Sequence, residues 1–279
     1  MQHVQPILVV DLFPYERKQL LKLFSELDTE EWEKPTICPG WTVKDIALHL
    51  LGDDIGYLSG RRDHFSNPFF RNKDLHAWPS LVTNINEANE LWVQATTRIS
   101  PKLLSALLEL TGVQFHDYMQ SLDPMAINGV VSWAGPDPAP AWLDIAREYT
   151  ERWLHQQQIR DAVKKPGFTE RRFFHPVLDT FVRALPYTYK DMPAPATTVL
   201  KFVVMGEAGD VWYLVREADT WSLAQDVELP PVTVVTMDQE TCWRLFTKGI
   251  GKDQARMKTA IEGEQKLGEK LLETVSIIA

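Results

Sequence analysis

Cysteine is scarce in this sequence, and its scarcity narrows the kinds of protein that the chain can be. The 279 residues contain two cysteines, Cys38 and Cys242, which lie far apart along the chain. Neither belongs to a Cys-x-x-Cys pair or to the Cys/His spacing of a zinc finger. We predict two free thiols in a reducing cytoplasm, with a single disulfide as the alternative.

Runs of basic residues and long apolar stretches are also missing. The formal net charge is −9 and the sequence pI is about 5.3, which argues against nucleic-acid binding. No apolar stretch approaches the length that spans a bilayer. The first residues, MQHVQPILVVDLFPYERK, contain only the short apolar run ILVV and lack the basic start of a signal peptide. We therefore expect a cytoplasmic protein with no nucleic-acid partner and no membrane association.

The first part of the chain has the periodicity of helices. With 44% hydrophobic and 24% charged residues, the composition is that of a globular protein of one large or two medium domains. Apolar residues recur at helical spacing, and Thr42 followed by Asp45 resembles a capping box. Between the second and third helices, residues 61–79 read as a long irregular loop, and SWAGPDPAP (132–140) reads as a breaker. The predicted helices are 14–27, 42–60, 80–99, 101–122 and 141–164.

The character of the sequence changes after the run KKPG at 164–167. Short β-rich runs follow, separated by turns that contain Gly or Asp, and two helical segments close the chain. We predict a two-domain protein: an all-α four-helix bundle over 1–165 and a small α+β domain over 170–279, with the boundary near 165–175. The predicted C-terminal elements are strands at Val199–Val204, Val211–Val215 and within 230–238, and helices at 240–249 and 252–275.

Three side chains are candidates for a metal site. Glu151 and His155 are four residues apart in a predicted helix, so both project from the same face. A third ligand, His49, comes from the border of the apolar face of another helix, as in the metal sites of helical bundles. Two imidazoles and one carboxylate suit zinc, nickel, cobalt or ferrous iron. The alternative is an ordinary polar pair on a helix surface and a histidine at the edge of the core.

Two stretches carry a resemblance to a known family. The runs PTICPGWTVKDIALHLLGD (35–53) and ERWLHQQQIRDAV (151–163) resemble the mycothiol-dependent maleylpyruvate isomerase family. The resemblance covers roughly residues 8–164 and implies a DinB-like four-helix bundle in which His49, Glu151 and His155 hold a divalent metal, foremost zinc. The C-terminal part, with TCWRLFTKG before its last helix, resembles the sterol-carrier-like domain of that family.

The resemblance also implies an activity. Members of the family use a low-molecular-weight thiol, mycothiol-like in this case, together with the metal. A thiol bound to a divalent cation loses its proton and becomes a nucleophile near neutral pH. The resemblance thus implies isomerisation or S-transfer on a small electrophilic substrate, by a monomer or a homodimer. The alternative is a non-catalytic binding protein that holds an apolar small molecule.

Other residues are candidates for supporting roles. Asp45 and Asp53 lie one helical turn on either side of His49, so either carboxylate is a candidate to accept a hydrogen bond from its free ring nitrogen, although Asp45 is also a helix cap. Arginines bind carboxylates of thiols or substrates, and Cys38 is a candidate nucleophile that the family pattern does not require. The candidate arginines are Arg61, Arg62 and Arg160, and the reserve metal ligands are His64 and His116.

Overall fold

A computed structural model describes residues 1–75 and 77–277 of the chain. The predicted loop at 61–79 and the predicted domain at 170–279 therefore each include positions outside the described residues. Among the helices that are described, none combines the length and the apolarity needed to cross a membrane.

The chain forms two compact units, one helical and one that contains a sheet, in line with the predicted two-domain organisation. The helical unit comprises 8–126 and 148–168. The sheet unit begins at 169 but also takes in 1–7 and 127–147, so the division is not the single boundary near 165–175 that we expected. The physical reason is pairing: residues 2–3 add a short strand to the sheet, and Trp133 and Leu143 pack in one apolar cluster with Ala184.

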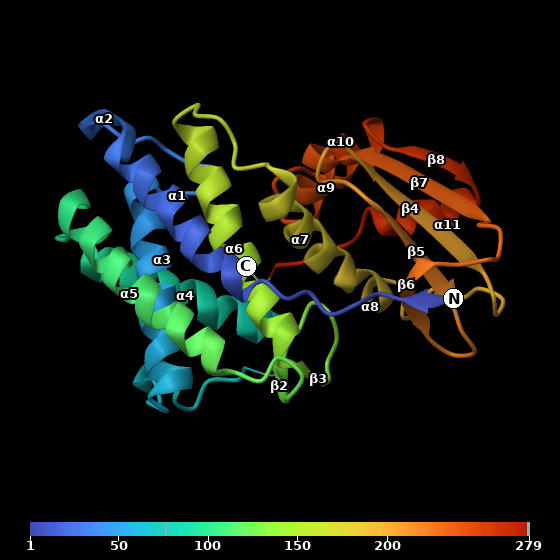
Figure 1. The fold of residues 1–279 in the computed structure, drawn as a ribbon, viewed down its shortest axis with the longest axis horizontal. Coiled ribbons are helices and arrows are strands. Elements are labelled where there is room, and N and C mark those ends of the chain that lie inside the picture. Colours follow the sequence, from blue (N-terminus) through green and yellow to red (C-terminus); the bar gives the residue numbers. More distant parts are fainter. Residues whose placement is uncertain (76, 278–279) are drawn as a thin grey trace. The chain divides into compact units, whose positions relative to one another are not determined.

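The helices of this part of the chain follow the segments that the periodicity predicted, except for the short α2, which lies where no helix was predicted (Figure 1). Thr42 and Asp45 form the predicted capping box, and Pro101 occupies the first turn of its helix, where the missing N–H costs nothing. Part of the predicted loop is ordered as the π-helical turn η2 (Leu58–Arg62) and the 3-10 turn η3 (Pro68–Phe70). The helices are α1 (Phe13–Ser25), α2 (Thr29–Trp32), α3 (Val43–Tyr57), α4 (Trp78–Thr96), α5 (Pro101–Ser121) and α6 (Ala141–Ala162).

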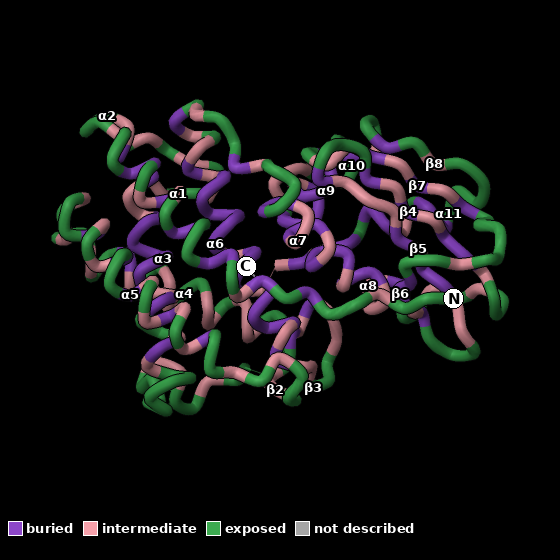
Figure 2. Tube along the Cα trace, in the orientation of Figure 1, coloured by how far each residue is buried: buried purple, intermediate pink, exposed green. Residues whose placement is uncertain are grey.

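The apolar faces of these helices meet in one core (Figure 2). Side chains from α1, α3, α5 and α6 are buried together, and Val93 adds the contribution of α4. Helix α3 is buried along much of its length, because it packs against both α4 and α5. The fully buried members include Leu20, Leu23, Ile46, Leu50, Leu104, Leu108 and Ile159.

A buried ionic network crosses this core. The carboxylate of Asp54 on α3, which has no exposed surface, accepts hydrogen bonds from Arg17 at 2.8 and 3.1 Å, Arg152 at 2.9 Å and Thr111 at 2.6 Å. Burial opposes the ionisation of Asp54, but the guanidinium groups of Arg17 and Arg152 outweigh it and hold its pKa below the ordinary value. Four helices, α1, α3, α5 and α6, are therefore joined through one carboxylate.

The sheet unit contains one mixed sheet with the strand order β1-β6-β5-β4-β7-β8. In the centre, β4 pairs antiparallel with β5, so that Phe202 lies opposite Trp212, and parallel with β7, so that Phe202 also lies opposite Val235. The predicted strands at 199–204 and 211–215 and the predicted helix at 240–249 are confirmed. The strands are β1 (Gln2–His3), β4 (Val199–Met205), β5 (Val211–Arg216), β6 (Trp221–Asp226), β7 (Thr233–Asp238) and β8 (Ala260–Gly263), with α9 (Gln239–Phe246) after β7.

The predicted final helix at 252–275 is wrong. This segment forms α10 (Lys252–Met257), strand β8 and α11 (Gln265–Leu271). Strand β8 pairs antiparallel with β7, and Gly263 ends it with φ +84°, where an added Cβ would lie 2.1 Å from a backbone oxygen. Edge pairing and this glycine conformation outweigh the helical composition of Lys, Glu and Leu.

The sequence analysis also missed helix α7 (Arg171–Phe181) and the short hairpin of β2 (Ile127–Val130) and β3 (Pro138–Pro140). Pro176 lies inside α7 and obscures the helical pattern, although the buried side chains follow it closely. These buried residues include Phe173, Phe174, Val177, Leu178 and Phe181. After α7 come the 3-10 turn η4 (Val182–Ala184) and the short helix α8 (Leu185–Thr188).

Removing the central carboxylate of the network should destabilise the helical unit strongly. We expect Asp54→Ala to lower its free energy of unfolding by about 3–5 kcal/mol, because Arg17 and Arg152 then remain buried without their shared counter-ion. Denaturant unfolding followed by far-ultraviolet circular dichroism measures the change. The control is Asp117→Ala, an exposed aspartate on α5, for which we expect a change within about 0.5 kcal/mol. Equal effects of the two substitutions would contradict the role of the network.

Candidate functional site

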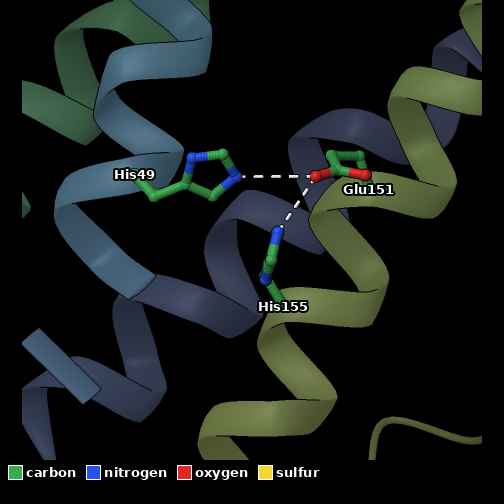
Figure 3. A group of neighbouring side chains, drawn as sticks. All are labelled: His49, Glu151 and His155. Atoms are coloured by element: carbon green, nitrogen blue, oxygen red, sulfur yellow. Dashed lines mark hydrogen bonds and ion pairs between the residues drawn. The ribbon is translucent and has the colours of Figure 1, made fainter. Parts of the chain in front are cut away.

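The structure brings the three predicted metal ligands together between α3 and α6 of the helical unit. The Nε2 atom of His155 lies 2.9 Å from Oε1 of Glu151, and the Nε2 atom of His49 lies 3.5 Å from the same oxygen. Figure 3 shows both imidazoles pointing at the one carboxylate, His49 from α3 and the other two residues from α6. One nitrogen or oxygen atom from each of these side chains lies within 4.8 Å of the others.

The two imidazoles are more deeply buried than the carboxylate between them. The side chains of His49 and His155 are 6% and 10% exposed, whereas the side chain of Glu151 is 29% exposed. The rings contact each other edge to face at 4.7 Å between centroids, and Trp41 packs on His49 at 5.2 Å. The cluster therefore consists of two buried imidazole rings, one of them covered by Trp41, and a carboxylate that solvent can reach.

Charge couples Glu151 to His155. Desolvation opposes the ionisation of Glu151, but the charge and hydrogen bonds of His155 and His49 outweigh it and hold its pKa well below the ordinary value. In the same way, desolvation favours neutral His155, but the Glu151 carboxylate outweighs it and raises the pKa of the imidazole well above the ordinary value. The Glu151 carboxylate and the His155 imidazole thus each favour the charged form of the other.

Gln158 is a site residue that the sequence analysis missed. Its Oε1 atom lies 2.7 Å from Nδ1 of His155 and accepts a hydrogen bond from the N–H group there. The other ring nitrogen, Nε2, faces Glu151. The Cys38 thiol donates to the same Gln158 oxygen at 3.4 Å. Spacing gave a signal for Gln158, because it follows His155 by three residues on the same helix. Cys38 is therefore next to the site, although it contacts the side of His155 that faces away from Glu151.

The two aspartates of α3 lie in different places. Asp45 caps the helix: its carboxylate accepts hydrogen bonds from the backbone N–H of Thr42 at 2.9 Å and from the Thr42 hydroxyl at 2.8 Å. This is the capping role that we considered for it and not the role of orienting His49. Asp53, in contrast, lies 3.3 Å from Nε2 of His49. Burial and the neighbouring carboxylates outweigh the attraction of His49 and raise the pKa of Asp53 to about 6.

Two of the three predicted arginines, Arg62 and Arg160, have other partners. Arg61 and Arg62 are exposed in η2, and Arg62 forms an ion pair with Asp63 at 2.7 Å and a hydrogen bond with Gln114. Arg160 donates to the side chain of Gln156 on α6 and to the Pro166 carbonyl, which stabilises the end of that helix. Their roles in binding a thiol or a substrate stay predictions.

The reserve ligands are not part of the cluster. Within the described part of the chain, the cluster that could hold a metal consists of His49, Glu151 and His155. His116 lies on α5 with its Nε2 atom buried, and His64 is exposed after η2. The donor set fits a divalent cation, because two imidazole nitrogens and one carboxylate oxygen converge on one point.

A family model covers the part of the chain that carries this cluster. The family model described as "Mycothiol maleylpyruvate isomerase N-terminal domain" matches residues 13–160, more than half of the chain. These residues include all three members of the cluster. Comparison with curated proteins gave no match.

A solved structure shares the fold. The crystal structure of the mycothiol-dependent maleylpyruvate isomerase has a TM-score of 0.51 and 12% sequence identity, and the match covers 88% of this chain and 91% of that chain. A mutant of that isomerase with a histidine replaced by alanine has a TM-score of 0.46 and 13% identity, at the same coverage. Because the family model spans more than half of its length, this chain belongs to the family defined by the mycothiol maleylpyruvate isomerase N-terminal domain.

Proposed function

We propose that this protein is a metal-dependent enzyme that uses a low-molecular-weight thiol, mycothiol or one of similar chemistry, to isomerise a small electrophilic substrate or to transfer sulfur to it. The observation that carries the proposal is the convergence of His49 and His155 on Glu151. Family membership supports it, since the similar solved structure is a mycothiol-dependent maleylpyruvate isomerase.

His49, Glu151 and His155 would hold the metal, with zinc the first candidate and nickel, cobalt or ferrous iron the others. When bound, a divalent ion in such a site lowers the pKa of a thiol ligand and makes a nucleophilic thiolate available near neutral pH. Three protein ligands leave room for the thiol. Glu151 is the most exposed of the three side chains, so its carboxylate is the part of the cluster that solvent reaches.

The residues around the ligands prepare the site before anything binds. Gln158 holds the proton on Nδ1 of His155, which leaves Nε2 as the coordinating nitrogen. Trp41 packs on His49 and keeps water from one side of its ring. An electrophile with a double bond conjugated to a carbonyl group, as in maleylpyruvate, fits a thiolate that adds, allows bond rotation and leaves again.

We further propose that the helical unit is a DinB-like four-helix bundle and that the sheet unit is sterol-carrier-like. The proposal also includes a cytoplasmic location, a monomeric or homodimeric state, and a small molecule rather than a nucleic acid or a membrane as partner. The acidic composition and the absence of a basic run support the last point.

Metal content tests the ligand set. We expect about one zinc, nickel or iron per chain in the wild-type protein and little in His155→Ala, because the remaining two ligands bind weakly. Elemental analysis of tag-free protein after dialysis measures this. The control, His64→Ala, removes an exposed histidine outside the cluster and should keep the metal. Wild-type protein without metal, and without uptake on titration, would refute the enzyme as proposed.

Thiol consumption tests the chemistry. With mycothiol or a surrogate thiol and a cis-configured activated alkene, we expect conversion to the trans alkene without net loss of thiol for isomerisation, or loss of free thiol together with the alkene for S-transfer by addition, and a chelator should abolish either. The reason is that the thiolate forms only beside the cation. A protein that shows neither reaction but copurifies with a lipid-like molecule, whatever its metal content, would instead be a binding protein.

Gln158 should tune metal affinity without being a ligand. We expect Gln158→Leu to weaken zinc binding by about 10–100-fold, because Nδ1 of His155 loses the acceptor that fixes the ring and its tautomer. Competition with a chromophoric chelator measures the dissociation constant. Gln120→Leu, an exposed substitution on α5, is the matched control. Equal affinities of the two variants would show that Gln158 does not orient His155.

A further inference from the structure

Asp53 lies next to Nε2 of His49 and not next to the other ring nitrogen, where we expected it to accept a hydrogen bond. We expected its carboxylate to accept a hydrogen bond from the ring nitrogen of His49 that does not bind metal. Instead Oδ2 of Asp53 lies 3.3 Å from Nε2 of His49, the same atom that faces Glu151 at 3.5 Å. A ring nitrogen that coordinates a metal carries no hydrogen, so it cannot donate one to Asp53 at the same time.

The two helices present matching pairs of side chains. Helix α3 carries His49 and Asp53 four residues apart, and α6 carries Glu151 and His155 four residues apart. In each pair the carboxylate lies near the Nε2 atom of its own histidine, at 3.3 Å on α3 and 2.9 Å on α6. Together the two pairs bring two imidazoles and two carboxylates into one region between α3 and α6.

Exposure follows the same pattern on both helices. The carboxylate side chains are 26% and 29% exposed, while the imidazole side chains are 6% and 10% exposed. Asp53 and Glu151 both lie near Nε2 of His49. Among the described residues, the ligand atoms that all lie within 4.8 Å of one another belong to His49, Glu151 and His155, so the Asp53 carboxylate would turn toward the ion in order to bind it. Two carboxylates near one imidazole nitrogen repel each other, and a divalent cation between them would remove that repulsion.

We propose that Asp53 is a fourth protein ligand of the metal held by His49, Glu151 and His155, an inference that rests on the proposed function. The ligand set is then two histidines and two carboxylates. A second oxygen donor favours metals that accept five or six ligands, such as ferrous iron, cobalt or nickel, or a five-coordinate zinc, because a thiol still needs a position.

A sulfur ligand at position 53 gives a direct readout. In Asp53→Cys loaded with Co²⁺, we expect an intense thiolate-to-cobalt charge-transfer absorption in the near ultraviolet that cobalt-loaded wild type lacks. This band requires a sulfur–cobalt bond, so a cysteine that only supports the site from a distance does not produce it. The matched control is Ile55→Cys, an exposed position two residues further along α3, where no such band should appear.

The outcomes separate this inference from the proposed function. If wild type binds Co²⁺ but Asp53→Cys shows no new band, Asp53 is not a ligand and the three-residue site stands. If wild type binds no metal, both proposals fail. A band of equal strength in Ile55→Cys would also overturn the inference, because the signal would then come from non-specific cobalt–thiolate binding. Asp53→Asn adds a second measurement, since unchanged cobalt affinity in this variant would contradict a ligand role.

Discussion

The buried contact between Asp54 and two arginines is the interaction on which the helical unit depends. One carboxylate without exposed surface accepts hydrogen bonds from α1, α5 and α6 while it belongs to α3. Removing charges from water is costly, so the network is weak support for stability as such. Its geometry is demanding, however, because each guanidinium must meet the carboxylate from a defined direction. The network therefore sets how these helices rotate and slide against one another.

That constraint positions the candidate metal site, because ligand and network residues are neighbours in the chain. Asp53 precedes Asp54 on α3, and Glu151 precedes Arg152 on α6. Successive residues on a helix point about 100° apart, so one side chain enters the core and the other faces the cluster. Burial shows the alternation: Asp54 and Arg152 are almost fully buried, while Asp53 and Glu151 are partly exposed. A rigid ionic core thus supports the side chains that would hold the cation.

The site and the sheet illustrate different degrees of predictability. The helices of the first unit follow from periodicity and caps, and the spacing of Glu151 and His155 follows from the helical turn. The matched family region includes His49, and the fold is shared with a solved structure at 12% identity. The helix predicted at 252–275 was wrong, because the pairing of β8 with β7 joins segments that are distant in sequence. Local composition favoured a helix there, and no local signal reports an edge strand.

The sequence by itself determined the helical and sheet-containing parts, the capping box at Thr42 and the three side chains of the cluster. These depend on local spacing, which a single helix or strand expresses without its neighbours. Only the tertiary structure decided that His49 of α3 meets Glu151 of α6, and that Asp54 joins four helices. Those features depend on distances between helices, and such distances arise from packing and hydrogen-bond geometry, which no run of consecutive residues contains.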